Sequence, residues 1–237
     1  PTTGTVTISN FSDNSQVRIG GAAVLSSNNQ GVLSGSDGGG SSGFILYKNP
    51  VNLGSDITIA AVIEQNKSGN GATIVGGVSL FLIDPARLAG FSRRGNNGGF
   101  GADAPETKAI VFGLDVKDNQ VVIKPGYPAY EKFKTVAVSE FSGYVGRIYA
   151  WLDWSGTGLN QELKLSFSKT ATKPSSPTLM MNVARELLPK LSGAPSSLAA
   201  YLGGTGAAIV GMSSLSEYSN GAAVWTVTSL TLSLIHI

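Results

Sequence analysis

Hydrophobic and polar residues alternate along most of the chain. The alternation is strict in residues 5–8 (TVTI), and residues 57–63 (ITIAAVI) form a longer run rich in β-branched side chains. Short runs of this kind, bounded by clusters of Gly, Asn, Pro and Ser, are typical of β-strands. The other strand-like runs are residues 15–24, 78–83, 109–116, 120–123, 135–138, 147–154, 163–167, 207–212 and 222–234.

The order of these runs predicts the fold class. About a dozen predicted strands follow one another with no helix between most of them, which is typical of an antiparallel sandwich or barrel. Trp151 and Trp225 fall in alternating runs, where their large side chains suit a core between two sheets. We therefore expect an all-β protein with both tryptophans in its core.

Helical spacing is confined to one region near the carboxyl end. Apolar residues recur at helical intervals over 180–191, and Pro189 would cut this helix short. A second, weaker helix is expected over 197–202. The fold class therefore includes one or two short helices beside the sheets.

The domain organisation follows from length and from the lack of a linker. A chain of 237 residues fits one large β domain, with two small domains as the alternative. Residues 35–43 (GSDGGGSSG) are of low complexity, but so short a segment favours a hairpin loop over a hinge. We expect a single domain over 1–237.

Composition and charge exclude several classes of protein. Charged residues make up 14% of the chain, too few for the outer faces of a helical bundle, and hydrophobic residues make up 42%, too many for a disordered chain. The net charge is +2 and is spread out, which argues against a nucleic-acid partner. No apolar run approaches the length of a membrane span.

The supply of reactive side chains is equally restrictive. There is no cysteine, and the single histidine is His236. This excludes disulfides, zinc–thiolate sites, sites with several histidines, and nucleophiles activated by a histidine within the fold.

Seven segments of the chain carry short motifs in a fixed order: residues 16–53, 77–82, 109–119, 149–165, 173–177, 210–214 and 224–227. Their order resembles that of the L-type (legume-type) lectins. In that family a strand ending in G-x-A is followed by Y-x-x-P-V-x-L, then by D-G-L-A-F-F, V-A-V-E-F-D-T-x-x-N, V-W-I-D-Y-N-G, K-P-x-x-P, V-G-F-S-A and a closing L-S-W-S-F. The resemblance covers about residues 4–232 and implies a concanavalin-like jelly-roll sandwich of two antiparallel sheets.

The resemblance also implies where a sugar would bind. The family's loop aspartate corresponds to Gly76, its glycine-rich loop to Gly98 and Gly99 in GNNGGFG, and its loop asparagine to Asn119. These four residues are the candidate ligand-binding set. Because Gly76 lacks the carboxylate that accepts sugar hydroxyls, the site is expected to be degenerate.

The family's double metal site is only partly matched. Asp115 and Asn119 keep the D-x-x-x-N spacing, whereas the strand glutamate corresponds to Gly113 and the second aspartate falls within residues 122–124. Two of the family's protein ligands, with Asp118 as an extra carboxylate, are few for calcium, which takes about six to eight oxygens. We expect no cofactor; the alternative is one weak calcium at Asp115, Asp118 and Asn119.

The sequence lacks the residue patterns of glycosidases and of nucleotide-binding proteins. Glycosidases of this architecture carry paired carboxylates along one strand, whereas Glu131 and Glu140 are isolated. GNNGGFG lacks the Gly-Lys-Ser/Thr of a phosphate-binding loop. The protein is expected to be non-catalytic.

A segment that the family lacks suggests a protein partner. Residues 190–205 are rich in Ala, Ser and Leu, and we expect this insertion to contact another protein together with the loop of residues 91–100. We also expect that a deletion of residues 192–203 leaves a folded sandwich. The candidate interface residues are Phe91, Phe100, Leu191, Leu198, Tyr201 and Leu202.

Two functional hypotheses remain open from the sequence. The favoured one is a lectin-like binding or scaffold domain, a structural or linker subunit of a larger assembly such as the algal phycobilisome, with other protein subunits as partners. The alternative is a genuine lectin that binds glycans at a non-standard, metal-independent site. Neither includes nucleic acid or a membrane span.

The ends of the sequence carry two further expectations. The chain begins at Pro1, so a leader could have been removed, which leaves secretion and an organelle such as the plastid both open. Residues 233–237 (SLIHI) resemble translated adapter sequence, the alternative being an ordinary last strand.

Overall fold

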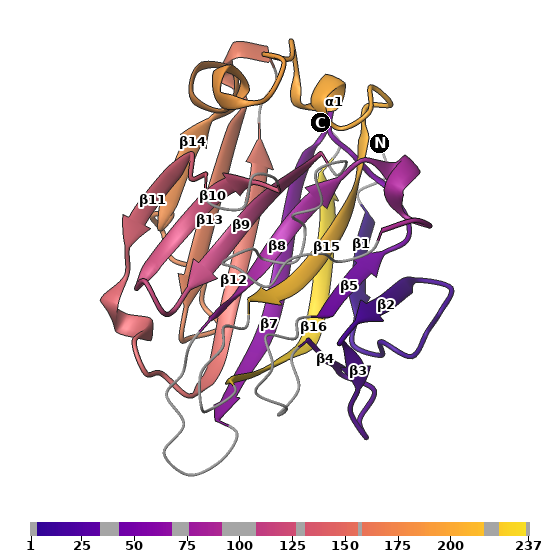
Figure 1. Ribbon diagram of the computed structural model, residues 1–237, viewed down its shortest axis with the longest axis vertical. Coiled ribbons are helices and arrows are strands. Elements are labelled where there is room, and N and C mark those ends of the chain that lie inside the picture. Colours follow the sequence, from indigo (N-terminus) through magenta and orange to yellow (C-terminus); the bar gives the residue numbers. More distant parts are fainter. Residues whose placement is uncertain are drawn as a thin grey trace.

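Two antiparallel sheets stacked face to face form the protein (Figure 1). The computed structural model describes residues 4–33, 43–67, 76–91, 108–126, 131–155, 158–215 and 223–235. Each sheet contains eight strands. The antiparallel sandwich expected from the sequence is confirmed.

The back sheet contains the longest strands, β7 and β16, which pair along most of their length. A break in register between Val227 and Ser229 marks a bulge in β16. The amino-terminal half of β16 pairs with β4 and its carboxyl-terminal half with β1. The strands are, in sheet order, β14 (Leu179–Asn182), β13 (Glu162–Ser168), β12 (Gly146–Ser155), β7 (Asp56–Lys67), β16 (Ala223–Ile235), β4 (Gly31–Val32) and β3 (Val24–Leu25), with β1 (Gly4–Ile8) beside β16.

The front sheet lies nearer the viewer in Figure 1, with β8, β9 and β15 at its centre. Short helical turns at η1 (Pro85–Arg87) and η2 (Ser139–Phe141) lie in its connections. The strands are, in sheet order, β11 (Lys134–Ala137), β10 (Gln120–Pro125), β9 (Ala109–Asp115), β8 (Gly77–Ile83), β15 (Ala207–Leu215), β5 (Gly43–Tyr47) and β2 (Val17–Gly21), with β6 (Val51–Asn52) beside β15.

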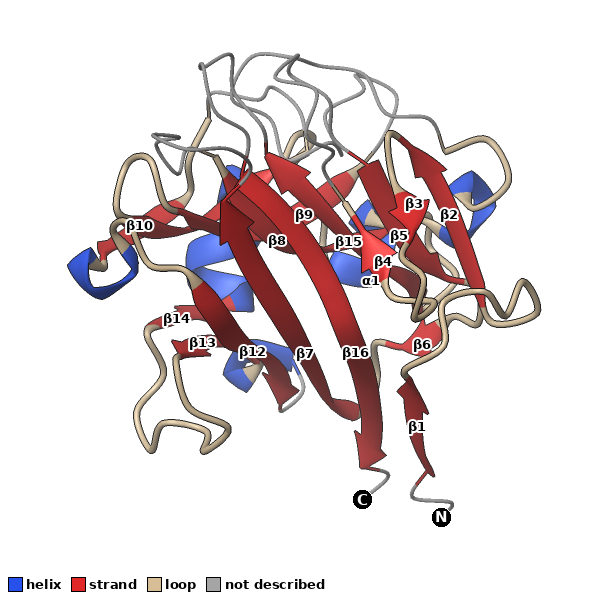
Figure 2. Ribbon diagram, turned by 90° about the horizontal axis from the view of Figure 1, so that it is seen from below, coloured by secondary structure: helices blue, strands red, loops and turns tan. Residues whose placement is uncertain are grey.

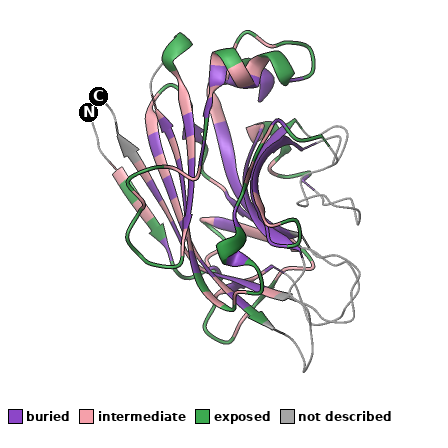
Figure 3. Cartoon of the chain, turned by 90° about the vertical axis from the view of Figure 1, so that its left-hand side faces the viewer, coloured by how far each residue is buried: buried purple, intermediate pink, exposed green. Residues whose placement is uncertain are grey.

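The main core lies between the two sheets, and Figure 3 shows buried residues along the strands of both sheets. The alternation seen in the sequence explains this core, because every second residue of a strand faces the same side. On β12 the inward residues are Ile148, Ala150, Leu152 and Trp154, and Trp225 on β16 is fully buried.

The prediction for Trp151 is wrong in one respect. Trp151 is only 9% exposed, but its strand neighbours Ala150 and Leu152 belong to the core between the sheets. Its side chain therefore lies on the outer face of the back sheet. There it stacks on Tyr149, with the ring centroids 6.2 Å apart.

A second hydrophobic cluster covers the outer face of the front sheet. Phe91 stacks on Phe81 at 5.5 Å between centroids and meets Phe44 edge-on at 4.8 Å. A side chain at Gly20 or Gly211 would overlap the rings of Phe44 and Phe81, respectively, so these positions require glycine. Phe91 is buried, so the expectation that it contacts another protein is wrong.

The helix predicted over 180–191 is only partly confirmed, because its first residues form a strand and short helical turns occupy residues 183–190. Leu179 and Met181 are buried, whereas Met180 is 45% exposed, which is the alternation of a strand, here β14. Only the short helical turns η4 (Val183–Leu187) and η5 (Leu188–Lys190) follow, and Asn182 caps the first by accepting a hydrogen bond from the backbone N–H of Arg185 (2.8 Å). Helical and strand periods overlap over so short a stretch.

The segment of residues 190–205 packs into the main core. The short helix α1 (Leu198–Tyr201) forms where expected, and Ser197 caps it. Leu191, Leu198, Tyr201 and Leu202 are all buried in the main cluster. Hence the expectation that these four side chains form an exposed interface is wrong, and a deletion of residues 192–203 would remove core side chains.

The first and last strands described are neighbours. β1 pairs with the carboxyl-terminal half of β16, so the first and last described strands lie side by side (Figure 2). Thr7 and Thr231 share a hydrogen bond across this pair at 3.1 Å. Within the described ranges, no helix is long and apolar enough to cross a membrane.

Candidate functional site

Three strand ends meet at one edge of the front sheet. In the register of the sheet, Gly77 on β8 lies opposite both Asp115 on β9 and Leu215 on β15. The backbone N–H of Val116 donates to the carbonyl oxygen of Gly76 at 2.9 Å, which joins the residue before β8 to the turn after β9. The structure thus brings Gly76 to the turn of residues 116–119.

This turn contains most of the candidate residues that can be placed. Asp115 ends β9, and Asp118 and Asn119 lie in the turn that leads to β10. Gly98, Gly99 and Phe100 fall outside the described residues. Gly76 is therefore joined to this turn through Val116, whereas a shared ligand-binding role of Gly76, Asn119 and the glycine-rich loop stays a prediction.

Backbone conformation fixes the two ends of the site. Gly76 has φ +95° and Asn119 has φ +51°, both in the region that L residues with side chains adopt rarely. Asparagine is one of the few side-chain-bearing residues that tolerate this region. The carbonyl oxygen of Asn119 accepts the N–H of Val138 at 2.7 Å, which ties the turn to the end of β11.

Both acidic side chains of the turn already have hydrogen-bond donors. Asp115 Oδ1 accepts the backbone N–H of Asp118 at 3.1 Å, and its Oδ2 accepts from Gln120 Nε2 at 3.3 Å. The same Gln120 amide donates to Asp118 Oδ2 at 3.2 Å. Lys132 Nζ lies 3.3 Å from that Asp118 oxygen and forms an ion pair with it.

The electrostatics of the turn centre on Asp115, which is 7% exposed. Burial raises the pKa of the Asp115 carboxyl, because a charged group loses hydration there. The hydrogen bonds from Asp118 and Gln120 and the charge of Lys132 oppose this rise. The pKa nevertheless stays above its ordinary value. The hydrogen bonds and the charge of Lys132 therefore make up for only part of the hydration that the ionised Asp115 carboxylate loses on burial.

Asn119 contributes a buried side-chain acceptor that lacks a donor among the described residues. Its Oδ1 atom is buried and has no hydrogen-bond partner in the structure as described. A buried polar atom without a partner costs about 1–3 kcal/mol. The atom is suited to a hydroxyl or water that would donate to it.

The turn does not fit the metal pair that the lectin resemblance implies. Gly113 has no side chain, and Ile123 is fully buried in the core. Among the described residues, no group of three or more His, Cys, Asp or Glu side chains could hold a metal ion. Asp115, Asp118 and Asn119 supply fewer oxygens than the about six to eight that calcium takes, and Lys132 already pairs with Asp118.

The sequence analysis did not predict two residues whose side chains contact the turn, Gln120 and Lys132. Gln120 faces Asp115 directly in the β9–β10 hairpin, so the hairpin register would have revealed it. Lys132 reaches the turn only through the tertiary structure, and no local sequence signal marks it. A polar pair also lies buried on the same sheet, where the hydroxyls of Ser79 and Ser213 are 2.9 Å apart.

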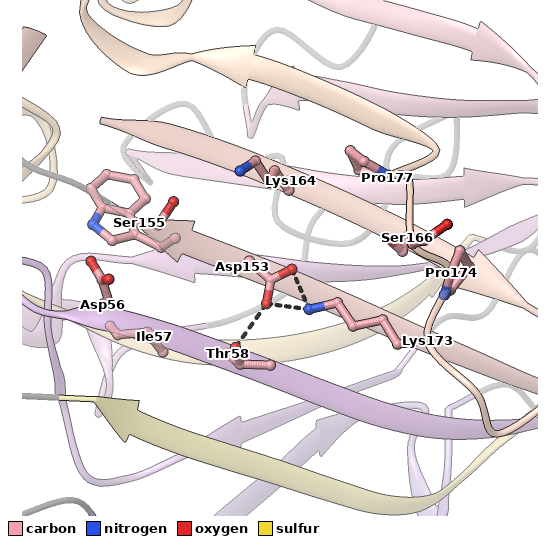
Figure 4. A pocket seen from close by; sticks show the side chains of 12 residues that line it. Asp56, Ile57, Thr58, Asp153, Ser155, Lys164, Ser166, Lys173, Pro174 and Pro177 are labelled. Carbon is pink, nitrogen blue, oxygen red and sulfur yellow. Dashed lines mark hydrogen bonds and ion pairs between the residues drawn. The ribbon is translucent and has the colours of Figure 1, made fainter. Parts of the chain in front are cut away.

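A separate polar groove of about 330 Å³ lies on the back sheet (Figure 4). Asp153 on β12 accepts hydrogen bonds from Thr58 Oγ1 at 2.7 Å and from Lys173 Nζ at 2.6 Å. Lys173 belongs to the segment that crosses from β13 to β14, so this ion pair holds that segment over the sheet. Asp153 is thus engaged in structural contacts.

Comparison with known proteins supports the fold. No family model matches the sequence, and no curated protein sequence matches it. Three similar solved structures are basic winged bean lectin with Tn-antigen (TM-score 0.70, 16% identity, 99% of each chain), peanut lectin with a peptide (0.67, 16%, 100% of each) and arcelin-5, a lectin-like defense protein from Phaseolus vulgaris (0.69, 14%, 100% of each).

The similarity extends over the whole chain and establishes the fold. The protein is a concanavalin-like jelly-roll sandwich of the L-type lectin type, as the motif order indicated. The carbohydrate recognition domain of Emp46p has the same fold, with a TM-score of 0.59, 16% identity, and coverage of 93% of this chain and 89% of that one.

Proposed function

We propose that this protein is a non-catalytic carbohydrate-binding domain with its site where β8 begins and β9 and β15 end. The observation that carries the proposal is the convergence of Gly76, Asp115 and Asn119 at that edge, in a fold shared with lectins over nearly the whole chain. The similar winged bean structure contains a glycan antigen.

The polar groups of the turn support this role. Asn119 Oδ1 is an acceptor without a donor, and sugar hydroxyls are donors. Gly76 offers backbone groups but no carboxylate, so fewer fixed acceptors are present than in the family pattern. We therefore expect weaker binding than that of a lectin with an aspartate at this position.

The non-catalytic part of the proposal rests on the state of the carboxylates. Hydrolysis of a glycoside needs an acid and a second carboxylate on either side of one bond. Asp115 is buried behind hydrogen bonds to Asp118 and Gln120, and Asp153 is bound by Thr58 and Lys173. Neither is presented to a substrate as one of a matched pair.

The scaffold role that the sequence favoured loses five of its six candidate interface residues, and the sixth, Phe100, lies outside the described residues. Phe91, Leu191, Leu198, Tyr201 and Leu202 are all buried. A structural or linker role would require another surface, and no contact among the described residues favours one. Glycan binding is accordingly the function that the geometry supports best.

A glycan microarray with the full chain tests the proposal. We expect specific signals that Asn119→Ala removes, with circular dichroism showing an unchanged fold. Asn160→Ala is a matched control, because Asn160 is exposed in the helical turn η3 (Gly158–Asn160) between β12 and β13. An array without any specific signal, or equal loss in both variants, contradicts the proposal.

A further inference from the structure

The turn after β9 brings together two carboxylates, of which one is buried. Carboxylates gathered in this way need a positive partner, since an uncompensated buried charge is strongly destabilising. In lectins of the resembling family, metal ions meet that need. The residues of this chain do not fit such ions, so the charge must be balanced by other means.

We propose that Lys132 and Gln120 replace the metal ion of this turn, so that the turn holds its shape without a divalent cation and becomes responsive to calcium when Lys132 is removed. Lys132 is thus a positioning residue that acts through Asp118. The proposal concerns the turn itself and does not depend on whether a glycan binds.

The hydrogen-bond geometry supports the substitution. Gln120 Nε2 links both carboxylates, at 3.3 Å from Asp115 Oδ2 and 3.2 Å from Asp118 Oδ2. Lys132 Nζ adds a full charge at 3.3 Å from Asp118 Oδ2. An ammonium and an amide N–H₂ therefore face the oxygens that a cation would otherwise attract.

While Lys132 is present, the remaining side-chain acceptor, Asn119 Oδ1, does not complete a metal site. Asn119 Oδ1 is one neutral oxygen, and calcium takes about six to eight oxygens with several carboxylates. An ammonium at Asp118 also repels a second cation at the same oxygens. Removal of that ammonium should leave Asp115, Asp118 and Asn119 as a weak oxygen-rich site.

Thermal unfolding with and without calcium tests the inference on the intact chain. We expect the Tm of the wild type to be unchanged by EDTA and by calcium at about 1 mM, the level that weak extracellular modules bind. The Tm of Lys132→Ala should fall without calcium and rise by about 2 °C or more when calcium is added. Lys132→Arg should keep the wild-type behaviour, because it retains the charge.

Lys134→Ala is the matched control. Lys134 Nζ forms an equivalent ion pair with Glu186 Oε1 at 2.8 Å, and this pair is not part of the turn. Its Tm should not respond to calcium. If Lys132→Ala does not fold, Gln120→Glu provides the same test, because a third carboxylate should also create a calcium response. A wild-type Tm that falls in EDTA or rises with calcium overturns the inference. So does a Lys132→Ala or Gln120→Glu variant that ignores calcium as Lys134→Ala does.

Discussion

Arg18 Nη2 donates a hydrogen bond to the carbonyl oxygen of Phe91 at 2.9 Å, from a strand that is far away in the sequence. A second nitrogen of the same guanidinium donates to the carbonyl oxygen of Leu88. The guanidinium also lies 5.5 Å from the centre of the Phe44 ring. Arg18 thereby fixes the segment whose Phe91 ring closes the cluster on the outer face of the front sheet.

Replacement of Phe91 by Ala should lower the free energy of unfolding by about 3–5 kcal/mol, as large truncations of buried aromatic side chains do. The reason is the loss of contacts with Phe44 and Phe81, which leaves a cavity over the sheet. Urea unfolding measures the effect. Leu159→Ala is the control, because Leu159 is 69% exposed and should cost less than about 0.5 kcal/mol. Equal stability of the two variants would show that Phe91 is not a core residue.

The two tryptophans should differ in their contributions to stability. Trp225→Ala removes a fully buried side chain from between the sheets and should cost about 3–5 kcal/mol. Trp151→Ala removes a side chain from the outer face, where its described ring contact is Tyr149, and should cost less. Chemical denaturation of both variants under the same conditions measures the difference. A larger loss for Trp151 would contradict the assignment of faces.

Asp115 gives a prediction for the dependence of stability on pH. Its folded-state pKa lies above the ordinary value of 3.8 for an aspartate, so the folded protein binds this proton more tightly than the unfolded chain does. The ionised carboxylate therefore lowers the free energy of unfolding at neutral pH. This loss is reversed as the pH falls through the folded-state pKa, because the carboxyl group becomes protonated.

Asp115→Asn should accordingly keep or raise the stability at pH 7, since Asn carries no charge and its Oδ1 can still accept the backbone N–H of Asp118. The advantage over the wild type should disappear below about pH 3.8, where the carboxyl is protonated in both states. Melting curves over this range measure it. A strong loss of stability at neutral pH would instead identify Asp115 as an essential ion ligand.

Much of the fold could be predicted from the sequence because the inward face of each long strand is continuously apolar. In β7, for example, Ile57, Ile59, Ala61 and Ile63 all face the core, and the period of two is unambiguous over this length. β14 has only four residues, so the run that includes Met180 and Met181 fitted a helix equally well. Only the burial of Met181 and the exposure of Met180 distinguish the two.

The candidate site was predictable in part for a different reason. Asp115 and Asn119 follow from motif order, and Gln120 from the register of a short hairpin. Lys132 contributes through a side chain that folds back onto Asp118, which depends on the tertiary structure. The prediction of an exposed interface in the 190–205 segment failed for a related reason. Composition does not distinguish an apolar side chain that packs into the core, such as Tyr201, from one that faces a partner.

The most direct test of carbohydrate binding is a calorimetric titration of the full chain with the glycan that gives the strongest signal on the array. The titration is carried out with and without EDTA. The account predicts saturable binding with the same Kd in both conditions, because the turn that carries Asn119 is held by Gln120 and Lys132. No saturable heat with any glycan would contradict the proposed function.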